Sequence, residues 1–157
     1  MNVENVGWVC QLTATFILAV LAGLDIKGKT IPLAFAVILA GMAVLDRGLL
    51  MVFGITGSTK GPILSVLLDT LAGMLPGIGV LVASVVSRGQ IGIGDGLLML
   101  AIGGMLGGIQ STEVFILSLF LVFVFSCGGL ILHRLTRTSA LPFVPFYFAA
   151  YLGVVYL

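Results

Sequence analysis

The sequence predicts an all-α integral membrane protein, built as a bundle of six transmembrane helices. Of its 157 residues, 60% are hydrophobic and only 8% are charged, and the mean hydropathy is +1.29. Soluble domains carry roughly a quarter charged residues, so a soluble class is excluded. Apolar runs that approach the ~20 residues needed to cross a bilayer recur along the chain. The runs cover residues 6–24, 31–45, 62–87, 95–109, 114–132 and 141–157.

Each of the first three runs is predicted to form a helix. Glu4 precedes the first run and no Lys or Arg does, which is the wrong charge for a secretory signal, so we expect a retained helix. The second run is short. Residues 49–55 form a brief further apolar stretch, interpreted as interfacial or as a continuation of the second helix. Pro76 should kink the third helix.

The last three runs differ in glycine content. Gly103 and Gly107, like Gly104 and Gly108, form small-xxx-small pairs in the short fourth run, which indicates close helix packing. Glu113 is expected to cap the short turn before the fifth helix. The chain shows no internal repeat, so residues 1–157 are predicted to form a single polytopic domain.

The basic residues predict the orientation in the membrane. Five of them lie in the first, third and fifth connections, namely Lys27, Lys29, Arg88, Arg134 and Arg137, whereas the second connection holds only Arg47 and Lys60. By the positive-inside rule the odd-numbered connections face the cytoplasm. We therefore expect a multi-pass protein of the cytoplasmic (inner) membrane, in contact with its lipid, with both termini outside the cytoplasm.

The composition also excludes several classes of site. The net charge of +1 and the absence of any basic run longer than two residues argue against a nucleic-acid partner. Cys10 and Cys127 lie singly in apolar runs, and His133 has no second ligand residue beside it. These residues predict neither a metal site nor a redox motif, and no cofactor is expected.

Two carboxylates are the candidates for chemistry. Asp25 ends the first run and Asp95 begins the fourth, so both are expected at the cytoplasmic face. Ionisable groups at membrane depth are costly and are therefore functional candidates. Two carboxylates held close share a proton, and one then acts as a base toward water while the other donates to a carbonyl oxygen. This pairing requires the first and fourth helices to be neighbours. The alternative is two interfacial aspartates, one paired with Lys27 or Lys29.

Helix dipoles predict how such a pair divides its roles. Asp95 at a helix start is favoured as the charged base, and Asp25 at a helix end is favoured as the proton carrier. A third acid, Asp69, lies inside the third run and is expected to be a hydrogen-bonded structural group.

Three short motifs lie at the ends of the predicted helices. They are Asp-Ile-Lys-Gly-Lys-Thr-Ile-Pro at residues 25–32, Gly-Ile-Gly-Asp at 92–95 and Leu-Pro-Phe-Val-Pro-Phe at 141–146. This combination resembles the type IV prepilin peptidase family, whose first aspartate precedes an Ile-Pro pair by a short basic loop. The family's second aspartate lies in GxGD, and its last helix often opens with Pro-Phe-x-Pro. The resemblance covers residues 25–156 and includes the six-helix layout.

The resemblance implies a membrane aspartic endopeptidase with an active site that faces the cytoplasm. Its substrates would be prepilins or pilin-like pseudopilins of type IV pili and protein secretion, cut between a basic leader and the hydrophobic helix that follows. Asp25 and Asp95 would be the catalytic pair. Gly92, Gly94 and Gly96 would form a flexible active-site loop near the scissile backbone. The candidates for substrate binding are Lys27, Lys29, Pro142, Phe143 and Pro145.

The chain departs from the family pattern at two positions. Leu97 stands where a Lys is frequent, and Leu33 stands where an Asn often follows Ile-Pro. We expect these two changes to alter recognition of the leader or to lower the activity. Larger members carry a soluble insertion with cysteine pairs and N-methyltransferase activity. Nothing in this sequence corresponds to it, so we expect proteolysis without methylation.

Two other functions remain open on the sequence. Presenilin-like and signal-peptide-peptidase-like enzymes also use GxGD, but they have about nine spans and a Pro-Ala-Leu motif, where this chain has Ala-Leu-Pro at 140–142. The other class is a small ion- or proton-coupled transporter that uses Asp25, Asp69 and Asp95 as relay groups.

Overall fold

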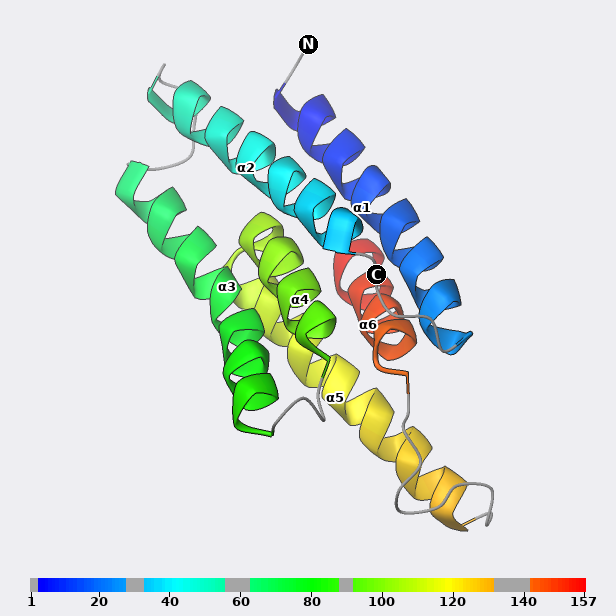
Figure 1. Ribbon diagram of the computed structural model, residues 1–157. Coiled ribbons are helices and arrows are strands. Elements are labelled where there is room, and N and C mark those ends of the chain that lie inside the picture. The colour runs from blue at the N-terminus through cyan, green and yellow to red at the C-terminus, as the bar shows by residue number, and fades with distance from the viewer. Residues whose placement is uncertain (1–2, 28–32, 56–62, 88–91, 132–141) are drawn as a thin grey trace.

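The computed structural model describes residues 3–27, 33–55, 63–87, 92–131 and 142–157. All regular structure within these ranges is helical, which confirms the predicted all-α class (Figure 1). The helices are α1 (Val3–Ile26), α2 (Leu33–Ile55), α3 (Ile63–Val86), α4 (Ile93–Leu106), α5 (Gly108–Ile131) and α6 (Val144–Tyr156).

Three of the described helices are long and apolar enough to cross a membrane. They are α3, α5 and the part of α1 that covers Trp8–Ile26. In α3 and α5 only 11% of the apolar window is buried inside the protein, so most of their apolar surface faces outward. The helices α4 and α6 are apolar but have only 14 and 13 residues. At 1.5 Å per residue each is ~20 Å long, against a hydrocarbon core of about 30 Å.

Two helix boundaries differ from the predicted runs because polar residues interrupt the hydropathy but not the helix. Residues 49–55 continue α2, which carries Asp46 and Arg47 in its interior. The helix α5 begins at Gly108, six residues before the predicted start at 114, and α4 ends at Leu106. Glu113 therefore lies in the second turn of α5, and the prediction that it caps a turn is wrong.

The helices α3 and α4 approach each other through glycine, as the small-residue pairs predicted. A Cβ atom added at Gly73 would overlap the carbonyl oxygen of Gly103, and one added at Gly77 would overlap the backbone of Leu100. The buried Ser111 hydroxyl of α5 donates a 2.7 Å hydrogen bond to the Gly73 carbonyl. The contact thus joins the backbones of α3 and α4, where glycines leave no side chain between them, and the Ser111 side chain links α5 to it.

Consecutive helices run in opposite directions (Figure 1), so the starts of α4 and α6 lie toward the same side as the end of α1. The helix α4 packs against α2, α3 and α5, whereas α1 packs against α2 and α6. The apolar side chains of all these contacts form one core. Its largest fully buried members are Tyr147, Tyr151, Leu18, Leu21, Leu39, Leu98, Met99, Ile102, Val114 and Val144.

Candidate active site

Asp95 lies in the first turn of α4, where the chain enters the helix from Gly92. Its backbone N–H donates a 3.2 Å hydrogen bond to the Gly92 carbonyl. Its carboxylate folds back over the same residue, since a Cβ atom added at Gly92 would lie 3.1 Å from Asp95 Oδ2. Glycine at position 92 therefore leaves room for the carboxylate in this orientation.

Asp25 lies in the last turn of α1 and joins that helix to the start of α6. Its Oδ2 accepts a 3.0 Å hydrogen bond from the backbone N–H of Val144, the first residue of α6. The first amide groups of a helix have no acceptor within the helix, so the Asp25 carboxylate supplies one for α6. The positive end of the α6 dipole favours a negative charge at this position.

The two aspartates reach the same end of the bundle through their helix ends. The main partners of α1 are α2 and α6, so the aspartates do not meet along a shared α1–α4 interface as the sequence required. They are linked instead through the start of α6. Asp25 accepts a hydrogen bond from Val144, the first residue of this helix, and the preceding Phe143 borders the same cavity as Asp95. The Asp25 carboxylate lies within Coulombic range of Asp95.

The position of Asp25 changes the expectation for a shared proton. From the sequence, the α1 dipole disfavours a charge on Asp25 and the α4 dipole favours one on Asp95. In the structure Asp25 also faces the N-terminus of α6, whose dipole acts in the opposite sense to that of α1. The end of α1 alone therefore does not decide which carboxylate is charged.

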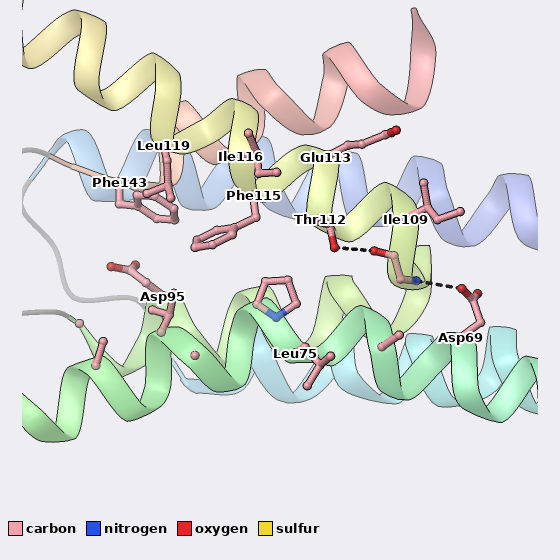
Figure 2. A pocket seen from close by; sticks show the side chains of 17 residues that line it. Asp69, Leu75, Asp95, Ile109, Thr112, Glu113, Phe115, Ile116, Leu119 and Phe143 are labelled. Carbon is pink, nitrogen blue, oxygen red and sulfur yellow. Dashed lines mark hydrogen bonds between the residues drawn. The ribbon is translucent and has the colours of Figure 1, made fainter.

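A cavity of about 1200 Å³ opens between α3 and α5, with Asp95 at one end (Figure 2). Figure 2 shows Asp95 and Phe143 at this end and Asp69 and Thr112 at the other. The side chains between the two ends are apolar except for Glu113. The full lining consists of Asp69, Ala72, Leu75, Pro76, Gly79, Val80, Ala83, Gly92, Asp95, Gly108, Ile109, Thr112, Glu113, Phe115, Ile116, Leu119 and Phe143.

The expected glycine loop is only partly a loop. Gly92 precedes α4, but Gly94 and Gly96 lie inside its first two turns. Gly96 is buried against α3, where an added Cβ atom would lie 2.8 Å from the Leu81 side chain and 3.0 Å from its backbone nitrogen. The prediction of a flexible loop is thus wrong for Gly94 and Gly96, because the Asp95 turn is already helical.

The candidate substrate-binding residues divide between two environments. Lys27 is exposed just after α1, and Lys29 lies outside the described residues. Pro142 and Phe143 precede α6 and Pro145 is its second residue, all three half-buried. Phe143 is the member of this set that borders the cavity, and its ring centroid lies 6.0 Å from that of Tyr147.

Asp69 belongs to a separate polar cluster at the junction of α4 and α5. Its Oδ2 lies 3.1 Å from Arg47 Nη1, and its Oδ1 accepts a 2.9 Å hydrogen bond from the Gly108 N–H. Arg47 also donates to the Met105 carbonyl at 3.1 Å from Nε and 2.5 Å from Nη2. Asp69 is therefore the hydrogen-bonded structural acid that the sequence predicted.

The Arg47–Asp69 cluster supplies hydrogen-bond partners for backbone groups at the sharp reversal between α4 and α5. Only Gly107 separates α4 from α5, and it has φ +87°, a conformation that favours glycine. The last carbonyls of α4 and the first amides of α5 lack helical partners, and Arg47 and Asp69 supply them. Sequence reasoning missed Arg47, because its partners lie 22 and 58 residues away in the chain.

No group of three His, Cys, Asp or Glu side chains in the described part of the chain is arranged to hold a metal ion. Comparison of the chain with models of protein families, with curated proteins and with solved structures found no match.

Proposed function

We propose that this protein is a membrane aspartic endopeptidase of the type IV prepilin peptidase kind. The observation that supports the proposal is the position of Asp25 and Asp95. They come from helices distant in the sequence and lie at one end of the bundle within Coulombic range of each other, with Asp25 bound to the start of α6 and Asp95 at the end of an apolar cavity. An acid pair of this kind suits peptide hydrolysis without a bound metal.

The chemistry follows from the environment of each carboxylate. The proposed roles are the reverse of those predicted from the α1 and α4 dipoles. Asp25, whose Oδ2 accepts a hydrogen bond from the Val144 N–H, acts as the base and takes a proton from a water molecule whose oxygen attacks the scissile carbonyl carbon. Asp95 donates its proton to the carbonyl oxygen. The C–N bond then breaks as protonated Asp25 transfers its proton to the leaving nitrogen, and a hydroxyl of the intermediate returns a proton to Asp95. Both carboxyl groups end in their starting states.

The proposed arrangement in the membrane has all six helices crossing it, with α4 and α6 as short spans. Short helices are accommodated where the bilayer thins or where a polar cavity enters from one side. The ends of α1 and the starts of α4 and α6 then face the cytoplasm, where the basic connections lie. The substrate is a pilin-like precursor whose basic leader remains in the cytoplasm and whose hydrophobic helix enters the bilayer.

The test is cleavage of a prepilin precursor by the purified protein in lipid bilayers, with the cut located by mass. Asp25→Asn and Asp95→Asn should each lower the turnover by at least 1000-fold while the protein stays folded and inserted. Glu4→Gln, which removes a carboxylate from the opposite end of α1, should retain normal turnover. Normal cleavage by either aspartate variant, or no cleavage by the unaltered protein, would contradict the proposal.

The transport hypothesis receives less support from the described residues. A relay requires titratable groups that exchange protons through the depth of the bilayer. Asp69, the carboxylate at the opposite end of the cavity from Asp95, is held by Arg47 and by the Gly108 N–H. A proton flux into vesicles that carry the protein, abolished by Asp69→Asn, would favour transport over proteolysis.

A further inference from the structure

The cavity beside Asp95 is a groove that follows two helices. Its lining on α3 extends from Asp69 to Ala83 and on α5 from Gly108 to Leu119. At 1.5 Å per residue these stretches are about 21 and 17 Å long. A helical segment of ~14 residues has the same length as the α3 side of this lining. The length of the groove therefore matches a single helical segment.

The two walls of the groove differ in the size of their side chains. On α3 the wall includes Ala72, Pro76, Gly79 and Ala83, which recur at intervals of four, three and four residues. On α5 the apolar members of the wall are larger, namely Ile109, Phe115, Ile116 and Leu119 (Figure 2), and Thr112 and Glu113 are its polar members. Small residues at this spacing allow another helix to approach the backbone closely, and the larger residues opposite provide packing area.

The polarity of the groove indicates which kind of segment fills it. Its lining contains three ionisable side chains, Asp69, Asp95 and Glu113, and all are acids. Asp69 is paired with Arg47, which leaves the pair of Asp95 and the nearby Asp25, with one negative charge between them, as the charged feature of that end of the groove. A lipid tail would place hydrocarbon on this acid pair. A chain that is cationic at one end and apolar along the next ~14 residues matches both parts of the groove.

We infer that the groove between α3 and α5 binds the hydrophobic helix of the substrate and places its junction with the basic leader at Asp95. This inference rests on the proposed function and extends it from the cleavage site to the apolar segment beyond. The substrate is then selected by its helix as well as by its leader. The cut falls next to the helix because the helix start and Asp95 share one end of the groove.

Gly79 provides a direct test, because it lines the groove and a Cβ atom added there would meet nothing within 4 Å. Gly79→Trp should fill the groove without disturbing the fold. Ile78→Trp is the matched control, since Ile78 is the adjacent residue, 44% exposed, and is not part of the lining. Two substrates distinguish binding from chemistry: a full precursor with its helix, and a peptide that ends a few residues after the cleavage site.

We expect Gly79→Trp to lower kcat/KM for the full precursor at least tenfold, through KM, and to leave cleavage of the short peptide unchanged. Ile78→Trp should match the unaltered protein on both substrates. Unchanged cleavage of the precursor by Gly79→Trp would mean that lipid alone occupies the groove and would overturn the inference. Equal losses on both substrates, or in both variants, would also overturn it.

Disulfide cross-linking gives an answer that does not depend on activity. In a protein with Cys10→Ala and Cys127→Ala, Gly79→Cys should cross-link to a cysteine in the precursor's helix, and Ile78→Cys should not. If the unaltered protein cleaves neither substrate, the proposed function fails, and this cross-link alone decides the groove. A cross-link only between two copies of the Gly79→Cys protein would show a dimer interface instead and would overturn the inference.

Discussion

Replacing Gly73 by alanine tests the contact on which the position of α4 depends. A Cβ atom at this site would overlap the Gly103 carbonyl oxygen and lie 2.8 Å from the Gly107 carbonyl carbon. Both are backbone atoms of α4 and of its junction with α5, so they cannot turn away as a side chain would. The helices must separate, and the 2.7 Å hydrogen bond from Ser111 to the Gly73 carbonyl lengthens or breaks.

The expected loss of stability follows from three contributions. Overpacking of a tight interface costs ~1–3 kcal/mol. A hydrogen bond between membrane helices contributes about 0.6 kcal/mol. Alanine gains about 1 kcal/mol over glycine in a helix interior. The unfolding free energy of Gly73→Ala should therefore fall by about 0.6–2.6 kcal/mol. Gly79→Ala, on the same helix with open space around the added Cβ atom, should instead gain up to about 1 kcal/mol.

The assay is reversible unfolding in mixed micelles of a mild and a denaturing detergent. Circular dichroism monitors the unfolding of both variants. If Gly73→Ala proves as stable as Gly79→Ala, α3 and α4 are not in backbone contact and our reasoning fails. Because α4 carries Asp95 at its start, Gly73→Ala should also lower the turnover of the folded fraction. Normal turnover together with lowered stability would mean that α4 moves without displacing Asp95.

The remaining predictions concern the α4–α5 junction and the orientation of the chain. Arg47→Met should lower the unfolding free energy by about 1–2 kcal/mol, less than the 3–5 kcal/mol typical of a fully buried pair, because the Asp69 side chain is 47% exposed. Arg47→Met with Asp69→Leu should be more stable than Arg47→Met alone, and an additive loss would exclude the ion pair as the cause. Lys60→Cys should react with a membrane-impermeant thiol reagent added outside cells and Arg88→Cys should not. The reverse pattern would invert the topology.

The proposed division of roles between the aspartates depends on α6. Asp25 is bound by the first amide of that helix, and Phe143, one residue earlier, borders the cavity that Asp95 enters. The start of α6 thus contacts both halves of the candidate site. A displacement of α6 would therefore change the environment of both carboxylates together.

The sequence by itself determined the helical class and the positions of Asp25 and Asp95 at helix ends. In lipid, the backbone hydrogen bonds of a long apolar run must be satisfied within the protein, and a helix satisfies them locally. Each of the six runs corresponds to a described helix. The glycine pairs of the fourth run predicted close packing, and Gly73 is the partner found against Gly103. Helix formation and the spacing of the glycine pairs depend on neighbours in the chain, so the sequence pattern contains them, whereas the pairing of Gly103 with Gly73 comes from packing.

Only the tertiary structure decided where polar residues end a helix and where they do not. Asp46 and Arg47 interrupt the hydropathy of α2, but Arg47 is neutralised by Asp69 and satisfied by the Met105 carbonyl, so the helix continues. The link from Asp25 to Val144 spans 119 residues of sequence. Whether a charge is costly or stabilising depends on partners brought by packing, and no local pattern records those partners.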